Sequence, residues 1–283
     1  MNLHDAILSR RSVRRYRAEP LDKTALALID DIVAGVRPLV PENRFRILRR
    51  DVVTGEDLIA AMGGYGRILS PPHYMVGYAV GERHPLVDLG YRMEQIAVQM
   101  VQLSISMCFI GNLGREENVR IRFRLNRDAR MGAFLIFGRA AQTGPDRTIN
   151  AAIRRASGGA SKQSVGQVFY NGSFKRSSSP PKILARIVNA GNVAPSANSA
   201  QPWRFLWHDD VLYLFLRRHN SRYGRKPELQ AYRYFDGGTC MANVMMAMEG
   251  TELLGDWVLL DGKPADVPEH PEDLEPLAKL VFR

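Results

Sequence analysis

A cluster of cationic side chains lies near the start of the chain, in residues 10–16, which read RRSVRRY. Arginine donates paired hydrogen bonds and keeps its charge, so it suits phosphate groups and polarised carbonyl oxygens. Arg10, Arg11 and Arg14 could converge on one anion together with the hydroxyl of Ser12. A solvated basic turn is the alternative, and composition alone favours it.

A second unusual stretch, residues 194–203 with the sequence APSANSAQPW, lies about 180 residues downstream. Its short polar side chains stand between two prolines, after an expected helix and before an expected strand. Proline restricts the backbone, Ser196 and Asn198 can bond nearby amides, and Gln201 offers a donor and an acceptor. Taken by itself, the stretch fits a helix-capping loop with a core tryptophan better than a binding site.

The apolar pattern places these segments between regular elements that occur twice. In the first part it predicts helices and strands at 3–10, 22–35, 45–48, 74–80, 86–107 and 132–138. A similar order follows, at 183–190, 205–207, 211–216, 236–254 and 280–282. The recurrence indicates an internal duplication.

The long central helices of the two parts align at an offset of 148 residues, which puts Asp88 and Gly90 on Asp236 and Gly238. Such matches are few, and amphipathic helices produce some by chance, yet the element order supports them. We expect two halves that pack as one unit, joined by a connecting segment whose apolar residues also pack. The expected boundaries are 1–155, 156–181 and 182–283.

Composition bounds the class of protein. A chain of 283 residues can bury a core without a metal or disulfide staple, and Cys108 and Cys240 lie in apolar segments, as buried free thiols do. No histidine or cysteine has metal-ligand spacing, so no metal site is expected. The absence of a signal peptide and of a long apolar run predicts a cytoplasmic protein without a membrane partner.

The formal net charge of +10, from 39 basic and 29 acidic side chains, favours anionic partners. Nucleotide phosphates, nucleic acid and a membrane surface all fit that charge. Because the basic clusters are scattered, contain few aromatic residues and match no nucleic-acid-reading motif, no nucleic-acid partner is expected.

Taken together, residues 10–14 and 194–203 resemble the two signature segments of the nitroreductase family of FMN-dependent oxidoreductases. The resemblance covers most of the chain, and the Asp88 to Gly90 segment that opens a long helix strengthens it. It implies an α+β fold, internally duplicated, in which each half is a mostly antiparallel sheet with helices packed on it. Ordinary members are homodimers that bind FMN between subunits, with one signature segment from each.

Here the arginine segment occurs in the first half and the Pro-Ser loop in the second. Their counterparts, residues 174–177 and 37–43, match the family pattern poorly. The resemblance therefore implies a fused, pseudodimeric branch of the family with one composite FMN site per chain. A monomeric pseudodimer is expected, and further oligomerisation stays open.

The resemblance also implies which residues bind FMN. The arginine segment would hold the phosphate and the pyrimidine side of the ring, through Arg10, Arg11, Ser12 and Arg14. The Pro-Ser loop would cover the ring edge, through Pro195 and Ser196, with Asn198, Ser199 and Gln201 as further candidates. A backbone amide aimed at flavin N5 would come from Gly111, Asn112 and Leu113, and a further phosphate contact from Arg154, Arg155 or Lys162.

One position departs from the family pattern. An asparagine commonly stands three residues after the serine, but this chain has Ser199 there and Asn198 one place earlier. A contact between Asn198 and the flavin therefore stays open, as does a relative that degrades reduced flavin. Residues 63–66 (GGYG) lack the lysine of a phosphate-binding loop and are expected to form a loop, one candidate for covering the flavin.

The implied activity transfers hydride from NAD(P)H through FMN to an electron-poor small molecule such as a nitroaromatic or a quinone. The flavin carries the redox chemistry, so no dedicated acid or base is required. Positive charge from Arg14 or Arg11 near flavin N1 and O2 would stabilise the reduced ring. A flavin-binding protein with little turnover, such as a sensor or store, is the alternative.

Overall fold

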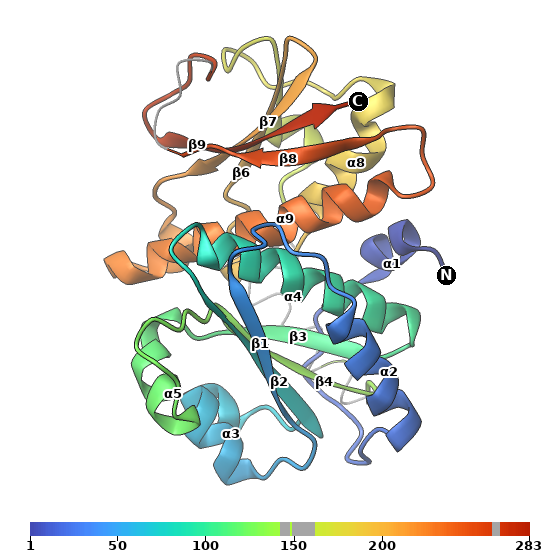
Figure 1. The fold of residues 1–283 in the computed structure, drawn as a ribbon, viewed down its shortest axis with the longest axis vertical. Coiled ribbons are helices and arrows are strands. Elements are labelled where there is room, and N and C mark those ends of the chain that lie inside the picture. The colour runs from blue at the N-terminus through green and yellow to red at the C-terminus, as the bar shows by residue number, and fades with distance from the viewer. Residues whose placement is uncertain (142–147, 149–161, 262–266) are drawn as a thin grey trace.

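Two sheets lie at opposite ends of the molecule, with two long helices side by side between them (Figure 1). The computed structural model describes residues 1–141, 148, 162–261 and 267–283. The first sheet is antiparallel throughout, with the order β1 (Arg44–Arg50), β2 (His73–Val80), β4 (Ala133–Gly138) and β3 (Ser106–Gly111). Its half also contains α1 (Leu3–Ser9), α2 (Lys23–Ala34), α3 (Gly55–Met62), α4 (Pro85–Gln102), α5 (Glu116–Phe123) and the 3₁₀ turns η1 (Gly63–Arg67) and η2 (Leu113–Arg115).

The second sheet has the order β5 (Phe169–Asn171), β6 (Trp203–His208), β7 (Val211–Arg217), β9 (Leu274–Phe282) and β8 (Gly255–Leu259). Only β5 runs parallel to its neighbour. The helical elements of this half are α7 (Val165–Val168), α8 (Lys182–Asn192), α9 (Tyr232–Met248), η3 (Ala197–Ser199), η4 (Ser221–Tyr223) and η5 (Pro227–Ala231). Leaving β5 aside, the order β6-β7-β9-β8 repeats β1-β2-β4-β3, which confirms the predicted α+β fold with two mostly antiparallel sheets.

Two glycines bring α4 and α9 into close contact between the sheets. A Cβ atom added at Gly90 would lie 2.1 Å from the carbonyl oxygen of Phe235, and one at Gly238 would lie 2.0 Å from that of Val87. A side chain at either position would collide with backbone, so the helices approach closely only because both residues are glycine. Gly90 and Gly238 are the pair that the 148-residue offset predicts.

Several predicted boundaries differ from the structure. The helix expected to reach Met107 ends at Gln102, Ser104 adopts a φ of 57°, and a strand begins at Ser106. The prediction was wrong because the buried residues of β3 continue the apolar run of the helix, and periodicity does not separate the two. The helix expected at 236–254 is α9, which begins earlier and ends earlier, at Tyr232–Met248, and residues 255–259 form the unpredicted strand β8.

The described part of the connecting segment, residues 162–181, packs against the second half, as its apolar residues indicated. Val168 and Phe169 are fully buried, and β5 extends the second sheet. Cys108 and Cys240 are buried free thiols. Within the described residues, no helix is long and apolar enough to cross a membrane, and no group of three or more potential ligands is placed to hold a metal ion.

Candidate functional site

The arginine segment runs along the edge of the first sheet, beside β3. Ser12 forms a parallel bridge with Met107, and the amide of Val13 donates to the carbonyl of Met107 at 3.0 Å. Farther along, the hydroxyl of Tyr16 donates to the carbonyl of Ile136 in β4 at 3.2 Å. The sheet therefore fixes the backbone of this segment.

Arg10 turns inward from that backbone. Its side chain is 5% exposed, and its Nε lies 3.5 Å from Oε1 of the fully buried Glu94 in α4. Among the described residues, Nη1 of Arg10 has no hydrogen-bond partner. Arg10 is therefore not part of a solvated basic turn. Arg11 does fit that alternative, because it is exposed and donates to the carbonyl of Leu8 at 2.7 Å. Arg14 is half-buried.

The Pro-Ser loop is held on α9. Asp236 accepts a hydrogen bond from the amide of Ala197 at 3.0 Å, and the hydroxyl of Thr239 donates to the carbonyl of Pro195 at 2.9 Å. Within the loop, Ser196 Oγ accepts from the amide of Gln201 at 3.0 Å. Two contacts with one helix therefore set the position of the loop.

The outer part of this loop has an unusual backbone. Asn198, Ser199 and Gln201 have φ values of 50°, 55° and 44°. Asn198 donates to the carbonyl of Arg222 at 2.8 Å, and Ser199 accepts from the Arg222 side chain at 3.1 Å. Gln201 is 1% exposed and accepts from the amide of Gln163 at 2.7 Å. The structure thus places Gln201 as an internal support of the loop.

Lys162 lies beside the start of the Pro-Ser loop, and its charge also acts on Glu94. Its Nζ donates to the carbonyls of Val193 and Ala194, at 2.8 and 3.2 Å, where the Pro-Ser loop begins. The charges of Arg10 and Lys162 both act on Glu94, whose pKa burial raises to about 7. Arg10 and Lys162, about 150 residues apart in the chain, therefore both influence one carboxyl group. The other predicted phosphate ligands, Arg154 and Arg155, lie outside the described residues.

The third predicted group, Gly111, Asn112 and Leu113, lies at the end of β3 and contacts α9. The amide of Leu113 donates to the hydroxyl of Tyr232 at 3.0 Å, and a Cβ at Gly111 would lie 2.4 Å from that hydroxyl. Asn112 is 3% exposed, and neither polar atom of its side chain has a hydrogen-bond partner among the described residues. A buried amide without partners is costly, so Asn112 is suited to the polar edge of a ligand.

The sequence offset aligned Asp236 with Asp88 but assigned neither a role in the site, and it did not single out the other residues of α9 that hold these groups. Tyr232, Asp236, Thr239 and Asn243 are spaced by four, three and four residues, which puts them on one helix face. Burial raises the pKa of Asp236 to about 8, and the hydroxyl of Tyr223 bonds its carboxyl group at 2.7 Å. Their spacing was a usable signal, but it also fits ordinary helix packing.

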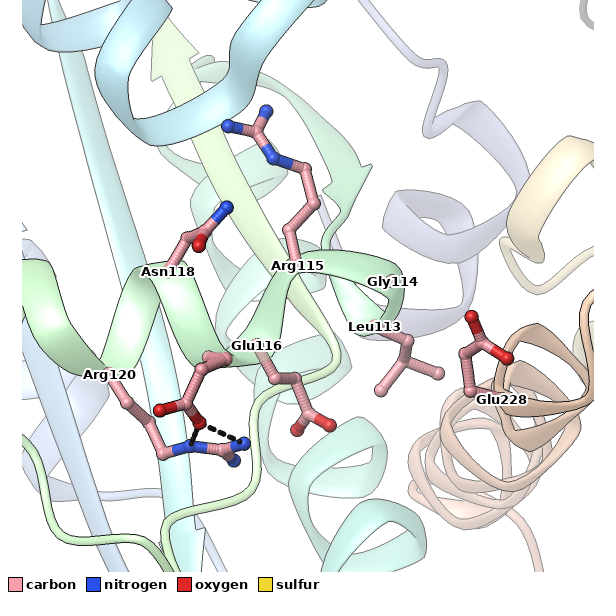
Figure 2. Close-up of a pocket in the computed structure, with 8 residues that line it drawn as sticks. Leu113, Gly114, Arg115, Glu116, Asn118, Arg120 and Glu228 are labelled. Carbon is pink, nitrogen blue, oxygen red and sulfur yellow. Dashed lines mark hydrogen bonds and ion pairs between the residues drawn. The ribbon is translucent and has the colours of Figure 1, made fainter.

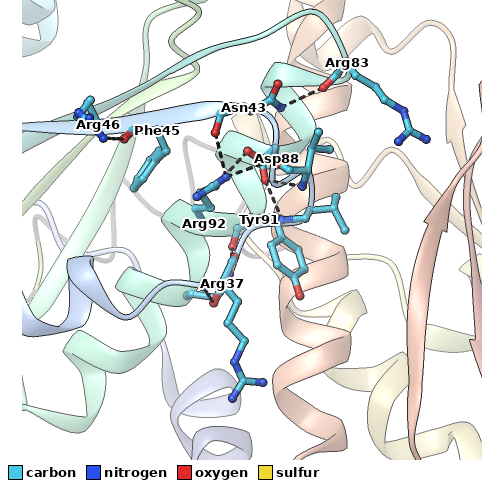
Figure 3. A network of polar contacts seen from close by, with 11 residues as sticks. Arg37, Asn43, Phe45, Arg46, Arg83, Asp88, Tyr91 and Arg92 are labelled. Carbon is cyan, nitrogen blue, oxygen red and sulfur yellow. Dashed lines mark hydrogen bonds and ion pairs between the residues drawn. The ribbon is translucent and has the colours of Figure 1, made fainter.

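The counterpart of the Pro-Ser loop, residues 37–43, is held on α4 in a similar way (Figure 3). Asp88 accepts from the amide of Val40 at 3.0 Å, as Asp236 does from the second loop. Here, however, Arg92 forms a 3.0 Å ion pair with Asp88 and donates to the carbonyl of Asn43. An arginine therefore occupies the centre of the network in the first half.

The counterpart of the arginine segment takes a different path. Residues 169–171 form β5 beside β6, and Tyr170 then bridges to Ser177. Phe174 packs edge-on against Phe215, with ring centroids 5.0 Å apart. Since β6 corresponds to β1 and β8 to β3, the two segments lie at opposite edges of equivalent sheets.

A polar pocket of about 250 Å³ lies beside Leu113 (Figure 2). It is lined by Leu113, Gly114, Arg115, Glu116, Glu117, Asn118, Arg120 and Glu228. A Cβ at Gly63 would lie 2.0 Å from Nη1 of Arg115, so the predicted loop at 63–66, which forms η1, packs against this side chain. The pocket carries both signs of charge.

Comparisons with known proteins place the chain in a family. Residues 2–223 match a family profile described as "Putative TM nitroreductase". This chain belongs to the nitroreductase family. Among solved structures, one described as a "putative nitroreductase" from Thermotoga maritima aligns with 100% of this nitroreductase-family chain and 94% of its own, at 16% identity and a TM-score of 0.57. That likeness shows a shared fold.

Shorter structures align with about half of this nitroreductase-family chain. An FMN-dependent nitroreductase from Clostridium difficile covers 49% of it with 87% of its own length, at 16% identity and a TM-score of 0.42. A structure from Desulfovibrio desulfuricans, described as a "putative nitroreductase in complex with fmn", covers 50% with 87% of its own length, at 19% identity and a TM-score of 0.42. A search of curated protein sequences found no significant match.

Proposed function

We propose that this nitroreductase-family chain is an FMN-dependent oxidoreductase that passes hydride from NAD(P)H, through the flavin, to an electron-poor small molecule such as a nitroaromatic or a quinone. The observation that carries the proposal is the convergence of the arginine segment and the Pro-Ser loop beside α4 and α9. Arg10 lies 3.5 Å from Glu94, and Lys162, whose Nζ donates to the carbonyl of Ala194, also acts on Glu94 through its charge.

The polar atoms of the arginine segment, Lys162 and Asn112 fit a flavin mononucleotide. Arg10, Ser12 and Lys162 would hold its phosphate through charge-assisted hydrogen bonds. Asn112, with its buried donor and acceptor, would bind a polar edge of the ring. Bound FMN would supply the redox chemistry, while Arg14 would add positive charge that favours the reduced ring. Pro195 and Ser196 would shield the ring edge from water.

We further propose one flavin site per chain, formed between halves 1–155 and 182–283, in a monomeric cytoplasmic pseudodimer. The repeated strand order supports the comparison with a dimer. The network around Arg92 and the opposite placement of β5 argue against a second site. Light scattering of the purified protein tests the monomer, which should have a mass near 31.8 kDa.

A flavin-binding protein with little turnover is the second candidate. One observation favours it: the amide of Leu113, in the segment that the family resemblance directs to flavin N5, already donates to Tyr232. If that bond persists with flavin bound, the amide of Leu113 cannot donate a hydrogen bond to flavin N5, and hydride transfer there loses its support.

The test combines a spectrum with an assay. We expect purified protein to show the blue absorption of oxidised flavin and to oxidise NADH or NADPH when a nitroaromatic or quinone is supplied. Arg10→Ala should lose the flavin and the activity, whereas Lys175→Ala, in the counterpart segment of the second half, should retain both. Yellow protein without turnover would support the second candidate. Colourless protein that does not bind added FMN would contradict both.

A further inference from the structure

Glu94 is a fully buried carboxyl group that is poorly compensated among the described residues. Its side chain is 0% exposed, and neither carboxylate oxygen has a hydrogen-bond partner among the described residues. The ion pair with Arg10 is 3.5 Å long, which exceeds the usual length of a charge-assisted hydrogen bond. Because an unsatisfied buried carboxylate is costly, packing alone does not explain an acidic residue at this position.

The groups that face Glu94 come from three parts of the chain. Arg10 approaches from the end of α1 and Asn243 from α9, while the exposed Lys162, in the segment before α7, acts through its charge. Burial raises the pKa of Glu94 to about 7, and the three neighbours only partly offset that effect. Both protonation states are therefore populated near neutral pH. The two cations are also the proposed ligands of the flavin phosphate.

The second half has no equivalent of this carboxyl group. At the 148-residue offset that aligns α4 with α9, Glu94 corresponds to Ala242. The segment equivalent to the arginine segment also lies at the other edge of its sheet there. The buried carboxyl group thus occurs in the half where Arg10 turns inward.

We propose that Glu94 is the counter-ion that a flavin phosphate displaces from Arg10 and Lys162, so that the site takes up a proton when a phosphorylated flavin binds. The inference rests on the proposed function and adds a regulation of the same site by pH. Binding converts the Glu94 carboxylate and one solvent proton into the neutral acid, which leaves both cations to the phosphate.

The direction follows from charge. A phosphate monoester carries about −1.5 to −2 charges at neutral pH, and a like charge beside a carboxyl group raises its pKa. The bound state therefore holds the proton more tightly than the empty site. By linkage, affinity for FMN falls as the pH rises above about 7, by at most tenfold per pH unit. Riboflavin, which has the same ring without phosphate, should show no such dependence.

Calorimetry of the full-length apoprotein measures the proton directly. Titrations with FMN near pH 7.5, in two buffers of different ionisation enthalpy, should show uptake of more than about half a proton per flavin. Riboflavin should show none. Glu94→Gln should abolish the uptake and make FMN affinity independent of pH. The matched control is Glu275→Gln, which removes a carboxylate paired with Arg233 at 2.6 Å in the second half and should change neither.

Binding of FMN to the wild type without proton uptake would overturn the role of Glu94 and leave the proposed function intact. Equal uptake with FMN and riboflavin would also overturn it, because the phosphate would then not be the cause. If Glu94→Gln does not fold, the wild-type comparison of the two flavins decides the matter. Failure to bind either flavin would overturn the proposed function, and this inference with it.

Discussion

The two halves hold equivalent loops with equivalent aspartates, yet they surround them with different charges. Asp88 has the guanidinium group of Arg92 beside it, whereas the carboxyl group of Asp236 is bonded by the hydroxyl of Tyr223. The first loop therefore encloses the ion pair between Asp88 and Arg92. At the start of the second loop, Lys162 donates to the carbonyl of Ala194. We therefore propose that these equivalent loops support only one flavin site per chain.

The largest expected effect comes from breaking the ion pair of the first half. Asp88→Asn should lower the free energy of unfolding by about 3 kcal/mol, because it leaves the buried Arg92 without its counter-charge. Denaturant unfolding of both proteins measures the difference. A loss below about 1 kcal/mol would show that Arg92 finds another partner and that the loop is not held by charge.

The contact between α4 and α9 should be sensitive in both halves. Gly90→Ala and Gly238→Ala should each cost about 2 kcal/mol of unfolding free energy, because the new Cβ meets a carbonyl oxygen of the other helix. Gly64→Ala is the matched control, since nothing lies within 4 Å of its added Cβ. Unequal costs at Gly90 and Gly238 would break the proposed equivalence of the two helices.

These glycines also show which features of the fold could be predicted from the sequence. The aspartate and glycine pairs of α4 and α9 were visible because an offset compares residue types that packing constrains tightly. The start of β3 was missed, since an apolar run looks alike in a buried helix and a buried strand. Glu94 was missed for another reason: one acidic residue in a helix is ordinary until the structure shows it buried beside Arg10.

The sequence likewise indicated some features of the candidate site and not others. The sequence indicated that the arginine segment and the Pro-Ser loop belong together, because their residue types resemble a known pair of motifs. It could not show that Lys162 bonds the start of the Pro-Ser loop or that Gln201 supports the loop from inside, since both depend on long-range packing. The roles of these residues in binding FMN stay predictions.

A smaller effect should distinguish the two cationic segments. Arg14→Ala should weaken FMN binding by about tenfold and lower the flavin reduction potential, because it removes one positive charge from the arginine segment. Arg176→Ala, in the counterpart segment, should change neither quantity. Fluorescence titration and redox titration measure them. Equal effects of the two variants would contradict the assignment of the site to one segment.

The smallest effect at neutral pH is expected at Asp236. Its pKa of about 8 in the folded protein exceeds the unfolded value of about 4, so the folded state binds more protons between these limits. Its contribution to stability therefore falls as the pH rises from about 4 to about 8. Asp236→Asn should cost less than about 1 kcal/mol at pH 7 and flatten this slope, whereas Asp88→Asn should keep it. An unchanged slope in Asp236→Asn would contradict a neutral carboxyl group.

The ratio of flavin to chain tests the central claim most directly. Purified protein saturated with FMN and freed of excess ligand can be measured by its visible absorbance and by native mass spectrometry. The asymmetry between the halves predicts one FMN per chain, with none retained after Arg10→Ala. Two FMN molecules per chain would contradict the account, because the half closed around Arg92 would then also form a site.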